Sequence, residues 1–263
     1  MKVVRITAAS AAMFMLIGSG PVIADGHGEY ADEGIIPVEI FACNFRDGKG
    51  PDDLDAVNAK WNEWMDDNEA TDYFAALMYP NFSTELNFDV AWIGGWEDGN
   101  AMGAGGDMWL NEGGEVGAEF NAVLKDCPAH VLFATMNMRE PKDSDDDEDD
   151  NFVLAFSNCT MNEGKTFEDV QAAQEKWNAH ADEYGFVGGS WVMWPIWGES
   201  ADADYDFKYV SSAPNYTALG NNFQLMAAGH WRKNEEIWGG LMDCDSARIY
   251  SGASVREMPE DDG

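Results

Sequence analysis

The sequence predicts an α+β fold made of two consecutive units, each with the order strand, helix, two strands, helix, strand. One observation is that Cys43 to Asn62 returns 116 residues later as Cys159 to Asn178, with eight identical positions in twenty and no gap. A second is that the apolar patterns following each copy recur in the same order at nearly the same spacing. An internal repeat of this length indicates the architecture before any local propensity does.

The first unit, residues 37–139, contains four β-prone segments and two helical patterns. Its strands are expected at 37–45, 74–79, 87–93 and 130–135, and its helices at 51–68 and at 107–124 or 115–124. The first helix is predicted by the acidic residues after Pro51 and by the apolar face that carries Trp61. We expect Trp61 to pack against a sheet, because apolar helix faces usually do. The glycine-rich segment 94–106 is expected to be a loop.

The second unit, residues 152–252, follows an acidic linker. Its strands are expected at 152–157, 190–195, 205–210 and 247–250, with one helix that carries Phe167 and Trp177 and another within 218–241. The linker, 140–151, has eight Asp or Glu in twelve residues. It lacks the glycine and closing glutamate of an EF-hand loop, so calcium binding is the weaker alternative there. The closing segment, 253–263, is expected to be a disordered tail.

The first 24 residues have the pattern of a secretory signal peptide. Lys2 and Arg5 precede an apolar run, and Ala24 ends a stretch of small or aliphatic residues that suits cleavage. The run is shorter than the roughly 20 residues that a membrane-spanning helix needs, which makes a membrane anchor the weaker alternative. We therefore expect a mature chain from about Asp25, with a leader at 25–36, in the periplasm or secreted.

The charge of the chain excludes two classes of partner. Asp and Glu number 49 against 15 Lys and Arg, which gives a formal net charge of −34 at pH 7. Nucleic acids and anionic membranes are bound through basic contacts to phosphate, so neither is an expected partner. Solubility in a salty medium explains the acidity better than an acidic binding role does. The sequence indicates no particular oligomeric state.

The cysteines predict disulfides rather than a metal site. Four cysteines in an exported chain allow three pairings, and the repeat favours Cys43 with Cys127 and Cys159 with Cys244. Each bridge would then lie within one unit. No CxxC pair with a nearby histidine supplies metal-ligand spacing, so no metal and no cofactor are predicted.

The order of elements over residues 37–252 resembles two ferredoxin-like domains fused in one chain, as in the dimeric α/β-barrel superfamily. The resemblance rests on element order and repetition, without a signature peptide. It implies two four-stranded antiparallel sheets of order 4-1-3-2, with helices on one face and a cavity where the bare faces meet. In that order the first strand ends beside the start of the fourth, where Cys43 and Cys127 would meet. Members include cofactor-free monooxygenases, isomerases, haem-dependent peroxidases and chlorite-degrading enzymes, so the fold selects no function.

The alternation of residues along the strands gives the candidate site. Phe88, Val90 and Trp92, and likewise Tyr205, Phe207 and Tyr209, form an aromatic face, and the opposite face carries Asp89, Asp206 and Lys208. If the aromatic face packs under the helices, the polar face lines the barrel. The catalytic candidates are Asp206, Lys208, Arg248 and His130, and the ligand-binding candidates are Asn44, Asp89 and Tyr250. The alternative is that these charges form exposed ion pairs on the surface.

Three functions remain open from the sequence. The favoured one is an exported protein that binds a small apolar or weakly acidic ligand in an aromatic-lined barrel or cleft. The first alternative is an enzyme similar to cofactor-independent monooxygenases or isomerases, using the catalytic candidates above. The second is a non-catalytic structural or interaction protein of the envelope, whose barrel is filled by side chains.

Overall fold

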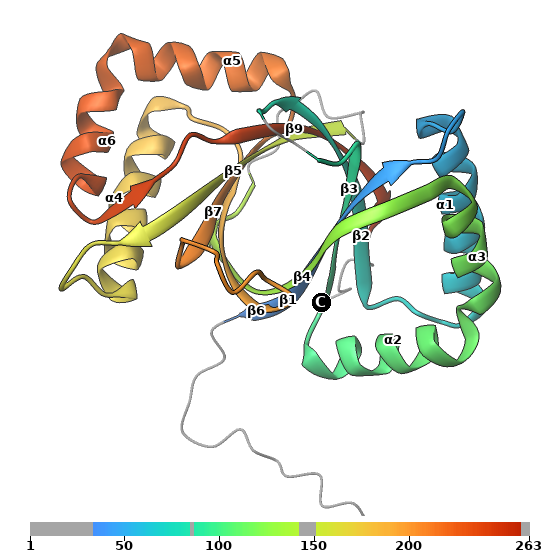
Figure 1. Ribbon diagram of the computed structural model, residues 1–263. Coiled ribbons are helices and arrows are strands. Elements are labelled where there is room, and N and C mark those ends of the chain that lie inside the picture. The colour runs from blue at the N-terminus through green and yellow to red at the C-terminus, as the bar shows by residue number, and fades with distance from the viewer. Residues whose placement is uncertain (1–33, 85–86, 142–150, 259–263) are drawn as a thin grey trace, which may run out of the picture. The chain divides into compact units, whose positions relative to one another are not determined.

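A computed structural model describes residues 34–84, 87–141 and 151–258 of the chain (Figure 1). The predicted signal peptide, most of the leader, the middle of the acidic linker and residues 259–263 lie outside this part. The elements of the first half are β1 (Ile35–Phe45), α1 (Pro51–Asp67), β2 (Tyr73–Phe82), β3 (Val90–Trp96), α2 (Gly99–Glu112), α3 (Gly114–Val123) and β4 (Leu124–Arg139).

The second half follows a similar order, and its helical region after β7, like that after β3 in the first half, is divided. Its elements are β5 (Asn151–Met161), α4 (Phe167–Tyr184), β6 (Ser190–Trp197), β7 (Phe207–Ala213), α5 (Tyr216–Leu225), the π-helical turn η1 (Met226–His230), α6 (Trp231–Trp238), β8 (Met242–Cys244) and β9 (Arg248–Arg256). The repeated block begins each half's first helix in the same way. The Asp53 side chain accepts a hydrogen bond from the N–H of Gly50, and Asp169 accepts one from Thr166, at 3.1 and 3.0 Å. These aspartates satisfy N–H groups that a helix start leaves without partners.

The strands form an α+β fold whose antiparallel sheet closes into a barrel. In the described chain the sheet has nine strands in the order β7-β6-β4-β1-β3-β2-β9-β5-β8, and β7 also pairs with β5. That extra pairing closes eight strands into a ring and leaves β8 outside it. The halves meet at two junctions, β4 beside β6 and β2 beside β9. Closure removes the exposed sheet edges that each half would otherwise have.

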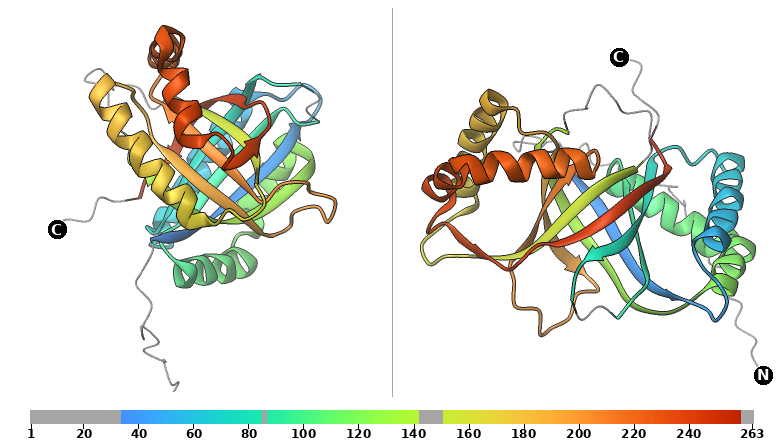
Figure 2. Two further views of the ribbon diagram at one scale, coloured as in Figure 1. Left: turned by 90° about the vertical axis from the view of Figure 1, so that its left-hand side faces the viewer. Right: turned by 90° about the horizontal axis from the view of Figure 1, so that it is seen from above.

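Helices cover the outside of the barrel, with α1 to α3 against one half and α4 to α6 against the other (Figures 1 and 2). On the first half, Leu54 and Val57 of α1 pack against Leu77 of β2. Trp61 is 5 % exposed and meets Trp92 edge to face, so it packs against the sheet as predicted. No helix in the described ranges is long and apolar enough to cross a bilayer.

Each half contains one disulfide, between Cys43 and Cys127 and between Cys159 and Cys244. These are the two pairs that the repeat predicted. Cys43 lies in β1 where the register with β4 shifts between Ala42 and Asn44, and Cys159 lies opposite Cys244 across β5 and β8. The bridges therefore tie the end of β1 to the beginning of β4 in the first half, and the end of β5 to β8, just before β9, in the second half.

Three predictions about the elements were wrong. The glycine-rich segment 94–106 is not a loop, because residues 94–96 end β3 and residues 99–106 begin helix α2. Asp98 accepts hydrogen bonds from the N–H groups of Asn100 and Ala101 at the start of this helix. Gly105 permits close packing there, since a Cβ would come within 2.8 Å of the Trp96 indole nitrogen. The expected single helix at 218–241 is broken at Gly229, whose φ of 123° is outside the helical region. Residues 253–256 belong to β9 and pair with β2, so the tail begins later than predicted.

Candidate functional site

The inside of the barrel is lined by alternate residues of all eight ring strands. Strands β1, β2, β5 and β6 run one way and β3, β4, β7 and β9 the other, since every pairing is antiparallel. Phe74, Phe152 and Trp191, near the starts of β2, β5 and β6, pack against the central apolar cluster and fill one end. The opposite end contains a cavity.

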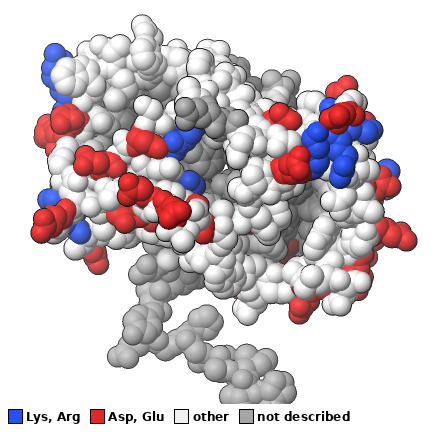
Figure 3. Space-filling model, in the orientation of Figure 1, with Lys and Arg blue, Asp and Glu red and all other residues white. Residues whose placement is uncertain are grey.

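The cavity has a volume of about 250 Å³. Its lining consists of Ile40, Ala42, Met78, Phe88, Ala91, Ala129, Val131, Phe133, Phe156, Glu199, Lys208, Arg248 and Tyr250. The first half contributes apolar side chains alone, and the second half contributes all three charged ones. In the space-filling view, basic side chains lie beside the hollow in the middle of this face, with acidic side chains around them (Figure 3). Pockets for drug-sized ligands are about 300–1,000 Å³, so this one suits a smaller molecule.

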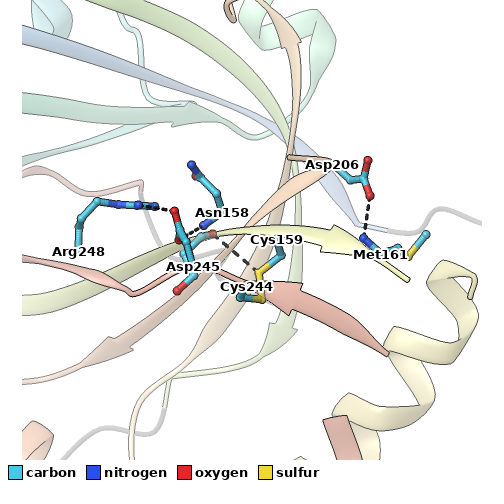
Figure 4. The surroundings of a disulfide bond; sticks show 8 residues. Asn158, Cys159, Met161, Asp206, Cys244, Asp245 and Arg248 are labelled. Atoms are coloured by element: carbon cyan, nitrogen blue, oxygen red, sulfur yellow. Dashed lines mark hydrogen bonds and ion pairs between the residues drawn. A yellow bond between two sulfur atoms is a disulfide. The ribbon is translucent and has the colours of Figure 1, made fainter. Parts of the chain in front are cut away.

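Strand pairing brings the two basic residues together. Lys208 of β7 lies opposite Asn158 of β5, and Arg248 of β9 lies opposite Phe156 on the other side of β5. The Lys208 Nζ donates to the Asn158 Oδ1 at 2.8 Å. The Arg248 Nη1 donates to Asp245 at 2.6 Å, and Asp245 also accepts from the Asn158 N–H at 2.8 Å (Figure 4). Because Asp245 follows Cys244, the disulfide positions the carboxylate that holds Arg248.

The surroundings of Lys208 in the cavity favour its neutral form. Burial lowers the pKa of Lys208 to about 8. The positive charge of Arg248 also lowers this pKa, whereas the negative charges of Glu199 and Asp245 raise it. The Lys208 Nζ lies 4.2 Å from the Tyr205 ring centroid, a cation–π contact. Tyr205 donates a hydrogen bond to Glu199. Burial raises the pKa of Tyr205 above its usual range, and this hydrogen bond raises it further. Burial also raises the pKa of Tyr250.

Three predicted site residues, Lys208, Arg248 and Tyr250, lie together at the cavity. Phe207 and Tyr209 pack on the outer side of β7, so the alternation of that strand directs Lys208 inward as expected. Phe88 differs from the expectation. It lies inside the barrel, where its ring stacks against that of Tyr250 with the two centroids 6.4 Å apart. Because β3 begins only at Val90, the alternation of inward and outward residues does not extend back to Phe88.

Asp89 and Asp206 lie away from the cavity and hold strand ends. The N–H of each donates to a cysteine carbonyl, of Cys43 at 3.0 Å and of Cys159 at 2.9 Å. Their carboxylates accept from the N–H of Phe45 at 3.0 Å and of Met161 at 2.7 Å (Figure 4). Neither is among the residues that line the cavity, so the geometry gives them a structural task and not the catalytic or binding one expected.

Asn44 and His130 also lie elsewhere. Asn44 donates to the carbonyls of Asn87 and Asp126 and so joins three segments of the first half. His130 is exposed on the outer side of β4, stacked on Phe41 and within 2.8 Å of Glu39. Since Val131 faces the cavity, its neighbour His130 must face outward.

Sequence reasoning missed two polar residues of the site, Asn158 and Glu199. Asn158 continues the inward series of Phe152 and Phe156 along β5, so extending the predicted strand by one residue would have found it. Glu199 lies in the connection after β6, where no periodicity indicates a direction. Among residues 34–84, 87–141 and 151–258, no three His, Cys, Asp or Glu side chains are grouped to hold a metal ion.

Comparison with known structures supports the fold class. A monooxygenase-like protein from Lactobacillus acidophilus NCFM matches at 11 % identity, over 85 % of this chain and 95 % of that one, with a TM-score of 0.50. Another from Fusobacterium nucleatum matches at 9 % identity, over 86 % and 94 %, also with a TM-score of 0.50. A heme-binding protein from Thermus thermophilus matches at 7 % identity, over 86 % and 95 %, with a TM-score of 0.48. No protein-family model and no curated protein matches the sequence.

The two matches with a TM-score of 0.50 show a shared α/β-barrel fold and do not extend to activity. Whether haem fits the cavity depends on the residues that line it. Its lining includes no histidine and no cysteine, so Tyr250 and Met78 are the lining residues of a type that ligates haem iron, and Tyr250 would have to lose its proton although burial raises its pKa. A volume of about 250 Å³ is also below that of pockets for drug-sized molecules. The cavity does not fit haem.

Proposed function

We propose that this protein is exported and that its cavity binds a small organic acid in its anionic form, with an aromatic or branched aliphatic body. We also propose that its halves are tandem ferredoxin-like repeats, because their strand orders β4-β1-β3-β2 and β9-β5-β7-β6 are equivalent. The presence of the cavity argues against the alternative in which side chains fill the barrel.

The observation that supports ligand binding most directly is the position of Lys208 and Arg248 on the rim of an apolar cavity. Burial penalises the charged form of Lys208, and a carboxylate beside it would offset that penalty. The wall formed by Phe133, Phe156 and Met78 would accept the apolar body of the same molecule. An uncharged ligand would leave the penalty on Lys208 in place.

The test is a calorimetric titration of the mature chain from Asp25 with benzoate and with its uncharged methyl ester. We expect benzoate to bind at least about tenfold more tightly than the ester, because only benzoate pairs with the amine. At pH 8.5 its binding should take up a fraction of a proton, because the nearby anion raises the pKa of Lys208. Proton uptake is measured by repeating the titration in buffers of different ionisation enthalpy.

Two variants test whether benzoate binds at Lys208. Lys208→Met should weaken benzoate binding about tenfold or more, whereas Lys125→Met should not change it, because Lys125 is paired with Asp47 on the outside of the first half. Equal affinity for benzoate and the ester, or no binding of either at millimolar concentration, would contradict the proposal.

A second candidate is a cofactor-independent oxygenase, favoured by the lowered pKa of Lys208. An amine that is partly neutral near pH 8 can act as a general base towards a weakly acidic O–H group. The expected result is oxygen uptake with 1,4-hydroquinone above the protein-free rate, lost in Lys208→Met. Uptake that is the same with and without protein between pH 7 and pH 9 would remove this candidate.

A further inference from the structure

Lys208 differs from other lysines of the described chain in its contacts. Lys49, Lys60, Lys125 and Lys233 each form an ion pair with an Asp or Glu, and Lys165 and Lys176 are exposed to solvent, whereas Lys208 lines the cavity. For Lys208, no carboxylate of the described residues lies within ion-pair distance, and its Nζ donates to a neutral amide oxygen, that of Asn158. Its remaining neighbours are aromatic, with the ring centroids of Tyr205 and Phe133 at 4.2 and 5.9 Å.

These surroundings suit an amine that reacts as a nucleophile. A nucleophilic lysine must be neutral, and burial beside a second cation is a known way to achieve this. The apolar wall and Arg248 supply both conditions, and the pKa of about 8 means that roughly half of the Lys208 amines are neutral at pH 8. The amine also lines the cavity, so a bound molecule can reach it.

We propose that Lys208 forms an imine with the carbonyl carbon of a small oxo acid held in the cavity. The inference rests on the proposed binding of an organic anion and names a substrate class for the same site. In this complex the carboxylate would pair with Arg248 instead of Lys208, through the guanidinium nitrogens other than the Nη1 that binds Asp245, so that the carbonyl carbon faces the neutral Lys208 amine. The aromatic and aliphatic wall of the first half would contact the body of the molecule.

The proposed step involves no oxidation or reduction. The lone pair of the Lys208 Nζ attacks the carbonyl carbon, a C–N bond forms, and the π electrons of the C=O bond move to oxygen. Proton transfer from nitrogen to oxygen gives a carbinolamine. The oxygen then leaves as water while the nitrogen lone pair forms the C=N bond. Glu199 lines the same cavity and is the carboxylate available to carry the protons.

The test is reductive trapping on the mature chain. Phenylglyoxylate, an aromatic 2-oxo acid, is added with sodium cyanoborohydride, and the product is examined by intact mass and by peptide mapping. We expect one secondary-amine adduct on Lys208, formed at least about tenfold faster at pH 8 than on Lys125, whose pKa is raised by its hydrogen bond to Asp47. Benzoate should slow the labelling, and the labelling rate should rise between pH 7 and pH 9.

Two variants complete the experiment. Lys208→Arg keeps the positive charge but removes the amine, so the adduct should disappear, whereas Lys125→Arg should label like the natural chain. Peptide mapping of the natural chain locates the adduct even where Lys208→Arg fails to fold. Benzoate binding without an adduct on Lys208, or labelling spread evenly over exposed lysines, would overturn this inference and leave the anion site intact. Failure of benzoate to bind would remove both.

Discussion

The two halves of the barrel place different side chains at equivalent cavity positions. The equivalent pairs, first half before second, are Ala91 and Lys208, Val131 and Arg248, and Phe133 and Tyr250, and the counterpart of Ala42 is Asn158, which accepts a hydrogen bond from Lys208. Away from the cavity the halves agree closely, with a disulfide in each and with Asp89 and Asp206 making the same kinds of hydrogen bond. The two halves therefore share these structural features, while the charged residues of the cavity belong to the second half.

This comparison explains why the repeated residues are poor guides to the site. Positions kept in both copies, such as Asp53 and Asp169 or Asp89 and Asp206, satisfy backbone N–H groups that every copy of the fold must satisfy. The charged residues of the cavity, Lys208 and Arg248, instead lie at positions where the two copies differ.

Removal of the disulfides should have the largest effect. The double variants Cys43→Ala/Cys127→Ala and Cys159→Ala/Cys244→Ala should each lose about 2 to 5 kcal/mol of unfolding free energy, because the bridges close loops of similar length, 84 and 85 residues. Urea unfolding of the oxidised mature chain measures this loss. Only the second variant should also weaken benzoate binding, because Asp245 beside Cys244 holds Arg248. Equal weakening by both would show that the halves contribute equally to the site.

The next largest effect should be a pH dependence of the unfolding free energy that comes from Lys208 in the second half. The folded state releases the Lys208 proton near pH 8, whereas the unfolded chain keeps it to about pH 10.4, so the unfolded state binds more protons between these values. Stability should therefore rise with pH in that window. Relative to Lys208→Met, the natural chain should gain about 1 to 2 kcal/mol of unfolding free energy between pH 7 and pH 9.5. A constant difference between the two proteins over this range would contradict the lowered pKa.

The two aspartates should give the smallest effect and the closest match between halves. Asp89→Ala and Asp206→Ala each remove a carboxylate that accepts a backbone hydrogen bond, so each should lose about 1 kcal/mol of unfolding free energy. Benzoate affinity should stay unchanged in both, since neither residue lines the cavity. Asp→Asn at the same positions keeps an acceptor oxygen and serves as the control. A clear loss of affinity in Asp206→Ala alone would return Asp206 to the site.

Part of the site was predictable from strand alternation. On β7, Lys208 lies between Phe207 and Tyr209, whose outward packing determines its inward direction, and Arg248 and Tyr250 follow the same rule on β9. The rule failed at Phe88 and Asp89, because these residues lie before the start of β3 at Val90 and the chain bends at Asp89. It gave no information on Glu199, which lies in a connection without a repeating pattern.

The sequence by itself determined the order of helices and strands along each half, the two cysteine pairs and the inward direction of Lys208. These follow from the internal repeat and from the two-residue alternation of strands, both of which are visible in the sequence without knowledge of any contact. Only the tertiary structure decided that α2 forms from a glycine-rich segment, that bulky side chains fill one end of the barrel, and that Lys208 and Arg248 share one cavity with the apolar wall of the first half. Those outcomes depend on contacts between segments far apart in the chain, because the pairings of β4 with β6 and of β2 with β9 close the ring.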